Sequence, residues 1–160
     1  MTVTIRSAVP EDAPELAKMR YEFRTSLNHA TESLEVFVER TAPWMAARLQ
    51  ASSNWRCWLA VGDDHIAGHL WLQLIEKIPN PAPELEQHAY ITNVYVSPDA
   101  RSEGLGARLM EMALAFCRES RVDSVILWPT DKSRTLYARH GFALPEDMME
   151  AVLEPARDVH

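Results

Sequence analysis

The feature that most constrains the fold is a strand that runs through a glycine turn directly into a helix. The β-prone run Ala89 to Val96 ends at Pro98, and Gly104 and Gly106 then open a helical stretch. The apolar face predicted for this helix consists of Leu105, Leu109, Met112, Ala113 and Phe116. A short, almost continuously apolar run, Val122 to Trp128, follows and is typical of a covered strand. Strand, helix and strand in this order predict a parallel crossover.

The residues before this segment predict one strand and two helices. Thr2 to Arg6 alternates like a short strand, and Pro10 opens a helix at the position where its missing N–H is tolerated. The stripe that this helix is expected to bury comprises Leu16, Met19, Phe23 and Leu27. A second helical stretch runs from Thr31 to Leu49, and Pro43 is expected to break or kink it near Ala42.

Further elements flank the crossover on both sides. They are strands at Trp55 to Val61, His65 to Ile75 and Met148 to Leu153, and a helix at Lys132 to His140. The loop Ile78 to Glu86 holds three prolines, Asp131 is placed to cap the last helix, and Gly141 suits the left-handed position after it. With no repeat and no long linker, residues 1–160 are expected to form one domain of the α/β class with a mixed sheet.

Composition and charge narrow the classes of function. The 160 residues are 47% apolar and 24% charged, as in an ordinary globular domain. With 23 acidic and 16 basic residues, the formal net charge of -7 is opposite in sign to that of most nucleic-acid binders and slightly favours a cationic amine as ligand. No apolar run is long enough to span a bilayer, and the start lacks the apolar region of a secretory signal. Cys57 and Cys117 indicate buried, reduced thiols and a cytoplasmic setting.

The glycine turn predicts an anion site. A strand that turns into a helix exposes unpaired backbone N–H groups at the positive helix end, and such groups bind phosphate oxygens. Two common phosphate motifs are excluded. Gly106 is followed by Ala107-Arg108 where a Walker A loop needs lysine, and Leu109 stands where a dinucleotide fingerprint needs a third glycine. A plain tight turn is the alternative to a binding loop.

Two ordered motifs resemble those of the GCN5-related N-acetyltransferases. Arg101-x-x-Gly104-x-Gly106, directly after a strand ending in Tyr95-Val96, resembles the coenzyme A motif of that family. The segment Leu136 to Phe142 resembles its second signature, a tyrosine followed by a Gly-Phe pair, and Ala8 to Ala13 resembles a common opening. The resemblance covers nearly the whole chain. It implies a mixed, mostly antiparallel central sheet with a splayed parallel strand pair and helices on both faces.

The resemblance also implies how acetyl-CoA is held. Its pyrophosphate would lie on the amides from about Ser102 to Ala107, and its pantetheine arm would bond to the backbone of Val94 and Val96. The amide of Val96 or Tyr95 would polarise the thioester carbonyl. The residues that the resemblance assigns to coenzyme binding are Val94, Tyr95, Val96, Arg101, Ser102, Gly104, Leu105, Gly106, Ala107 and Ser133.

The implied reaction is direct attack of a primary amine, on a small molecule or a peptide, on this thioester, with coenzyme A as the other product. Tyr137 would protonate the departing thiolate, and a packed core tyrosine is the alternative. The base is open. Tyr90 stands where some relatives carry a glutamate, which leaves Glu76, Glu86, His88 or water alone.

Other functions are weighed against this one. No metal is expected, because His65, His69 and His88 lack the spacing of a ligand motif. Glu103 would repel a pyrophosphate and is expected to point to solvent. The missing glutamate motivates a competing function, a non-catalytic acyl-CoA-binding sensor or interaction module. The acceptor, the use of other acyl groups and the formation of a homodimer stay open.

Overall fold

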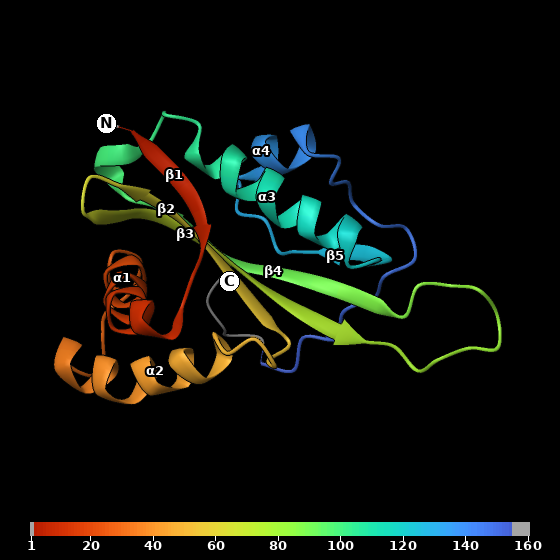
Figure 1. The fold of residues 1–160 in the computed structure, drawn as a ribbon, viewed down its shortest axis with the longest axis horizontal. Helices are drawn as coiled ribbons and strands as arrows, with labels where there is room; N and C mark the ends of the chain where they lie inside the picture. The colour runs from red at the N-terminus through yellow and green to blue at the C-terminus, as the bar shows by residue number, and fades with distance from the viewer. Residues whose placement is uncertain (1, 155–160) are drawn as a thin grey trace. The chain divides into compact units, whose positions relative to one another are not determined.

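The computed structural model describes residues 2–154 and contains a five-stranded mixed sheet (Figure 1). In spatial and chain order its strands are β1 (Val3–Ser7), β2 (Trp55–Gly62), β3 (His65–Glu76), β4 (Gln87–Val96) and β5 (Ser124–Ile126). The first three pairings are antiparallel, and β4 pairs with β5 in parallel. The predicted mixed sheet and its parallel crossover are therefore confirmed.

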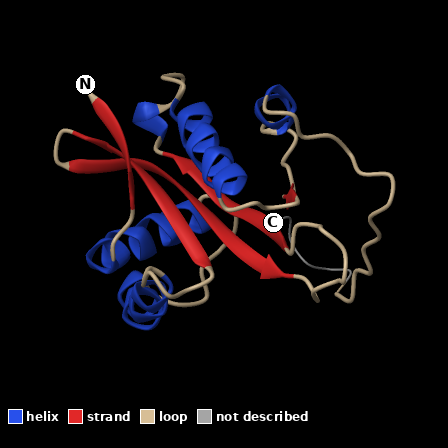
Figure 2. Cartoon of the chain, turned by 45° about the vertical axis from the view of Figure 1, so that its right-hand side comes forward, coloured by secondary structure: helices blue, strands red, loops and turns tan. Residues whose placement is uncertain are grey.

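Helices cover both faces of this sheet (Figures 1 and 2). The single turn η1 (Pro10–Asp12) leads into α1 (Ala13–Thr25), which packs with α2 (Leu34–Arg48) on one face, while α3 (Leu105–Glu119) lies on the other. The core on the first face consists of Ala13, Leu16, Ala17, Met45, Cys57, Leu59 and Trp71. On the second face Trp58 of β2 packs against Phe116 of α3, with 5.3 Å between the ring centroids.

The chain divides into two compact units after Ile126. The first unit holds the sheet, α1, α2, α3 and the short η2 (Pro98–Ala100). The second holds α4 (Arg134–Arg139), and Gly141 follows it with φ +88°, in the left-handed conformation predicted for it. The expectation that residues 1–160 form one domain stays a prediction.

The structure corrects three details of the predicted helices. Pro43 lies inside α2, which continues through it, because packing on the sheet outweighs the one backbone hydrogen bond that proline cannot make. Leu27 lies beyond the end of α1 and is exposed. On α3 the buried face turns toward Met110, which is fully buried, and Met112 is exposed instead.

The last part of the chain is less regular than predicted. Strand β5 has three residues, because the apolar run from Val122 pairs with β4 only at His88, Ala89 and Tyr90. The last helix begins at Arg134, with Ser133 rather than Asp131 preceding it. Residues 148–153 form no strand, since alternation alone supplies no partner for pairing. Among residues 2–154, every helix falls short of the length and apolarity that crossing a bilayer requires.

Candidate functional site

Strand β4 carries a bulge in its second half. Trp71 on β3 pairs with Thr92 and His69 pairs with Tyr95, so Asn93 and Val94 together oppose one β3 residue. Asn93 adopts φ +53°, a left-handed conformation that asparagine tolerates better than most residues. The bulge redirects the strand and changes which of its backbone groups face outward.

The edge of β4 beyond the bulge is open. Pairing with β5 ends at Tyr90 opposite Ile126, whereas β4 continues to Val96. The Ser97 N–H donates to the Ala67 carbonyl of β3 over 2.8 Å. Because alternate strand residues direct their backbone groups to opposite sides, the N–H group of Val96 points away from β3. This geometry leaves a donor on the side where an extended ligand can bind as an added strand.

The turn after β4 presents a row of free amides. Ser102 and Gly104 have φ of +69° and +74°, and α3 begins at the next residue. Within residues 2–154, the backbone N–H groups of residues 102–107 donate to no protein acceptor. They lie at the positive end of a helix of 15 residues, which favours an anion. The Glu103 side chain is exposed, as predicted.

Two arginines fix this turn in place. Arg101 Nε donates to the Val96 carbonyl over 3.1 Å, which ties the loop to the end of β4. Arg108 Nη2 donates to the Val3 carbonyl over 2.9 Å, which anchors the first turns of α3 to β1. The turn is therefore preorganised, and its two cations add to the attraction for a phosphate.

All predicted coenzyme-binding residues except Ser133 lie in this first unit, from Val94 to Ala107. Ser133 and Tyr137 belong to the second unit. The Ser133 hydroxyl accepts from the Thr130 N–H over 2.8 Å and donates to the Thr130 carbonyl over 3.0 Å, so it holds a local turn. Tyr137 is buried on α4 against Phe142, with ring centroids 5.8 Å apart.

The phenol of Tyr137 keeps its proton at neutral pH. Burial raises its pKa above the ordinary value of 10, and the Ser133 side chain opposes this with a smaller lowering effect. A phenol in this state can donate a proton to a strong base but does not ionise by itself. This property suits a general acid, and equally a packed tyrosine.

The three predicted base candidates lie near the start of β4, before the bulge. Glu76 and Glu86 are exposed on the two sides of the hairpin that joins β3 and β4. His88 Nδ1 lies 2.8 Å from the Ser124 hydroxyl and 3.9 Å from an Asp123 carboxylate oxygen. His88 and Tyr90 are two residues apart on β4, so their side chains lie on the same face of the strand, the face toward α1.

Two residues beside the bulge were given no individual role in the site by the sequence. Arg20 of α1 donates from Nη1 to Asn93 Oδ1 over 3.0 Å, and His69 of β3 is completely buried across from Tyr95. An asparagine within a run of strand-forming residues was a usable signal for the bulge, because asparagine is depleted in strands. Nothing in the local sequence marks the contact of Arg20, which depends on how α1 packs on the sheet.

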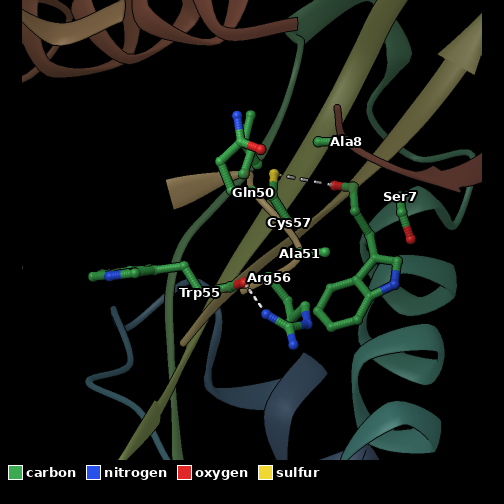
Figure 3. A pocket seen from close by; sticks show the side chains of 9 residues that line it. Ser7, Ala8, Gln50, Ala51, Trp55, Arg56 and Cys57 are labelled. Carbon is green, nitrogen blue, oxygen red and sulfur yellow. Dashed lines mark hydrogen bonds between the residues drawn. The ribbon is translucent and has the colours of Figure 1, made fainter. Parts of the chain in front are cut away.

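A separate hollow of about 250 Å³ lies between the end of α2 and the start of β2 (Figure 3). Trp55, Arg56 and Cys57 line it together with Ser7 and Gln50. Cys57 and Cys117 are both free and buried, as predicted, and burial raises the pKa of the Cys57 thiol well above its ordinary value. A thiol in this state is a poor nucleophile, and the hollow lies away from the open edge of β4.

His69 leads to a prediction about acid stability. The pKa of its imidazole is lowered from 6.5 to about 4, because burial and, to a smaller extent, the charge of Arg20 lower it while a hydrogen bond to the Asn93 backbone partly opposes them. The folded protein therefore keeps His69 neutral, whereas the unfolded chain binds a proton at its ordinary pKa. Through this residue the free energy of unfolding is expected to fall by up to about 3 kcal/mol as the pH drops from 6.5 to 4.

Urea unfolding of wild type and His69→Phe at pH 7 and pH 4.5 measures this effect. On acidification the free energy of unfolding is expected to fall less in the variant than in wild type. The difference should be most of the fall of about 3 kcal/mol that His69 causes. His65→Gln, a substitution of an exposed histidine at the start of β3, serves as the control and should behave like wild type. Equal acid sensitivity of wild type and His69→Phe would contradict a neutral buried imidazole.

The sequence matches the model of the Acetyltransferase (GNAT) family over residues 20–142. A comparison with curated proteins gave no match. The match to the family model covers more than half of the chain, so this protein belongs to the acetyltransferase (GNAT) family.

Solved structures share the whole fold. A predicted acetyltransferase with acetyl-CoA from Clostridium acetobutylicum is 18% identical, with a TM-score of 0.76 over 95% of this chain and 97% of that one. A GCN5-related N-acetyltransferase from Ralstonia eutropha JMP134 is 27% identical, with a TM-score of 0.74 over 94% and 99% of the two chains. Glucosamine-6-phosphate N-acetyltransferase from Arabidopsis thaliana is 15% identical, with a TM-score of 0.68 over 96% and 100%.

Proposed function

We propose that this protein transfers an acetyl group from acetyl-CoA to a primary amine of a small molecule or peptide and releases coenzyme A. The observation that carries the proposal is the row of free amides at residues 102–107, directly after the open edge of β4. A diphosphate fits the amides, and an extended amide-bearing arm fits the edge. We further propose the cytoplasm as its location, which agrees with two free, buried cysteines.

Different residues of the chain would bind the diphosphate, the pantetheine arm and the thioester carbonyl. Residues 102–107 and Arg101 would hold the diphosphate, while Val94 and Val96 would orient the arm. Acetyl-CoA supplies an activated thioester. The Val96 N–H, which points away from β3, would bind the carbonyl oxygen as negative charge develops on it.

The transfer would require the amine to lose a proton and the departing thiolate to gain one. The amine nitrogen forms a bond to the acetyl carbon as the carbon–sulfur bond breaks, so the amine loses a proton and the thiolate gains one. Tyr137 is the proposed donor to the thiolate, in agreement with its raised pKa. His88, Glu76, Glu86 and water alone remain the candidate acceptors for the proton of the amine.

The test is consumption of acetyl-CoA in the presence of a broad panel of primary amines. Release of free thiol above the rate without amine, together with the acetylated amine by mass spectrometry, is the expected result. Calorimetry with acetyl-CoA runs in parallel. Tight binding without transfer to any amine would favour the second candidate, an acyl-CoA sensor, which the tyrosine at position 90 in place of a glutamate supports.

A further inference from the structure

A half-buried cation without an anionic partner lies beside the β4 bulge. The guanidinium of Arg20 is removed from much of the solvent between α1 and β4, and its hydrogen bond goes to the neutral Asn93 amide over 3.0 Å. Within residues 2–154 no carboxylate oxygen lies within 4 Å of it. Arginines in such surroundings are usually paired with an anion, because desolvating a lone charge is costly.

The surroundings of Arg20 add positive charge. Burial lowers the pKa of Arg20, and the charge of Arg24, one helical turn along α1, lowers it further. Tyr90 of β4 is the group that acts in the opposite direction. Glu22, also on α1, raises the pKa of Tyr95.

His69 supplies an independent observation at the same place. Its side chain is completely buried, and within the described part of the chain its ring nitrogens make no hydrogen bond of ordinary geometry, although the Asn93 backbone lies close enough to favour the charged imidazole. The ring lies 5.7 Å from that of Tyr95, across from the bulge, and Arg20 is close enough to affect its charge. Buried polar atoms without full hydrogen bonding are rare in folded proteins, and a catalytic role or a bound water or ion is among the usual reasons for them.

The position of this cluster matters as much as its charge. Arg20 and His69 both adjoin Asn93, and the bulge lies on the part of β4 that β5 does not cover. They contact it from the α1 side of the sheet. Under the proposed function, the thioester would lie along this edge, so a group bound at Arg20 would come from the acceptor.

We propose that Arg20, supported by Arg24 and His69, forms an oxyanion-binding subsite and that the acceptor is an amine which also carries a carboxylate or phosphate group. This inference rests on the proposed acetyl transfer. A guanidinium binds either group with two parallel hydrogen bonds. The net charge of -7 slightly favours a cationic amine, whereas Arg20 places a positive charge at the bulge.

The test compares acceptors that differ only in the acidic group. The probes are amino acids against their carboxamides, and O-phosphoethanolamine against ethanolamine, each with acetyl-CoA. Wild type is expected to prefer the acidic member of at least one pair by about 10- to 100-fold in kcat/KM, which corresponds to one charge-assisted contact. The pair that is preferred identifies carboxylate or phosphate as the group recognised.

Arg20→Met should remove most of this preference, mainly through KM, and Arg20→Lys should keep part of it. Arg118→Met on α3 removes the same charge from an exposed site on the opposite face of the sheet and should leave the preference unchanged. Each ratio compares the kcat/KM values of two acceptors on one variant. A general loss of folded protein lowers both values equally and leaves their ratio unchanged. Equal use of acidic and neutral amines by wild type, or an unchanged ratio in Arg20→Met, would overturn the subsite while acetyl transfer stands.

A protein that acetylates no amine would refute the proposed function, and calorimetry then decides on the subsite separately. Binding of the acidic probes to the coenzyme A complex, weakened at least about tenfold by Arg20→Met, would retain the subsite in a non-catalytic protein. Failure of every acidic probe to bind would reject it.

Discussion

Gly104→Trp is expected to abolish measurable binding of acetyl-CoA while the protein stays folded. A Cβ at this position meets no atom within 4 Å, so the new side chain enters open space beside the free amides of residues 102–107. It would occupy the volume that a diphosphate needs. Losing two or more charge-assisted hydrogen bonds should raise the Kd at least ~100-fold.

The cost to folding is small by comparison. Gly104 has φ +74°, and a residue with a Cβ in this region is strained by about 1–2 kcal/mol. Asp64, Asn93, Ser102 and Arg121 already adopt positive φ in this chain, so its backbone accepts such strain elsewhere. The melting temperature should fall by several degrees, roughly 2–4 °C per kcal/mol.

Gly141→Trp is the matched control for Gly104→Trp. Gly141 has φ +88° and equally free space around its Cβ position, but it ends α4 and lies outside the amide turn. Calorimetry and thermal melting on both variants separate strain from ligand exclusion. Both should melt at a similar, lowered temperature, and Gly141→Trp should bind acetyl-CoA like wild type. Wild-type affinity in a folded Gly104→Trp protein would show that this turn is not the coenzyme site.

Local chemistry explains which elements were predictable. Pro98, Gly104 and Gly106 mark the end of β4 and the start of α3 through properties of single residues, so the crossover was visible in the sequence. The same holds for the left-handed Gly141. These signals need no knowledge of distant partners, and the structure agrees with them.

Contacts between distant segments explain the features that the sequence did not predict. Where β5 stops pairing with β4, and which helix face turns inward on α3, depend on packing that periodicity does not encode. Arg20 and Asn93 are 73 residues apart in the chain, and neither forms a motif with its neighbours. The coenzyme loop could thus be proposed from the sequence, whereas the contact between Arg20 and Asn93 required the fold.

Tyr137→Phe is expected to lower kcat by about 100- to 10,000-fold, the usual contribution of a positioned general acid. Phenylalanine keeps the ring that packs on Phe142, so the change removes only the hydroxyl and its interaction with the Ser133 side chain. Loss of one such contact should cost about 1 kcal/mol of stability, and the Kd for acetyl-CoA should stay within about threefold.

Steady-state kinetics with saturating acetyl-CoA, together with calorimetry, measure these two effects on the same samples. Thr135→Ala removes an exposed hydroxyl from the same helix and should leave kcat and Kd at their wild-type values. Since the pKa of Tyr137 is raised, its proton is present below that pKa and lost above it, so an alkaline decline of kcat in wild type should be absent from Tyr137→Phe. Unchanged turnover in Tyr137→Phe would leave this tyrosine with packing alone and assign protonation of the thiolate to solvent.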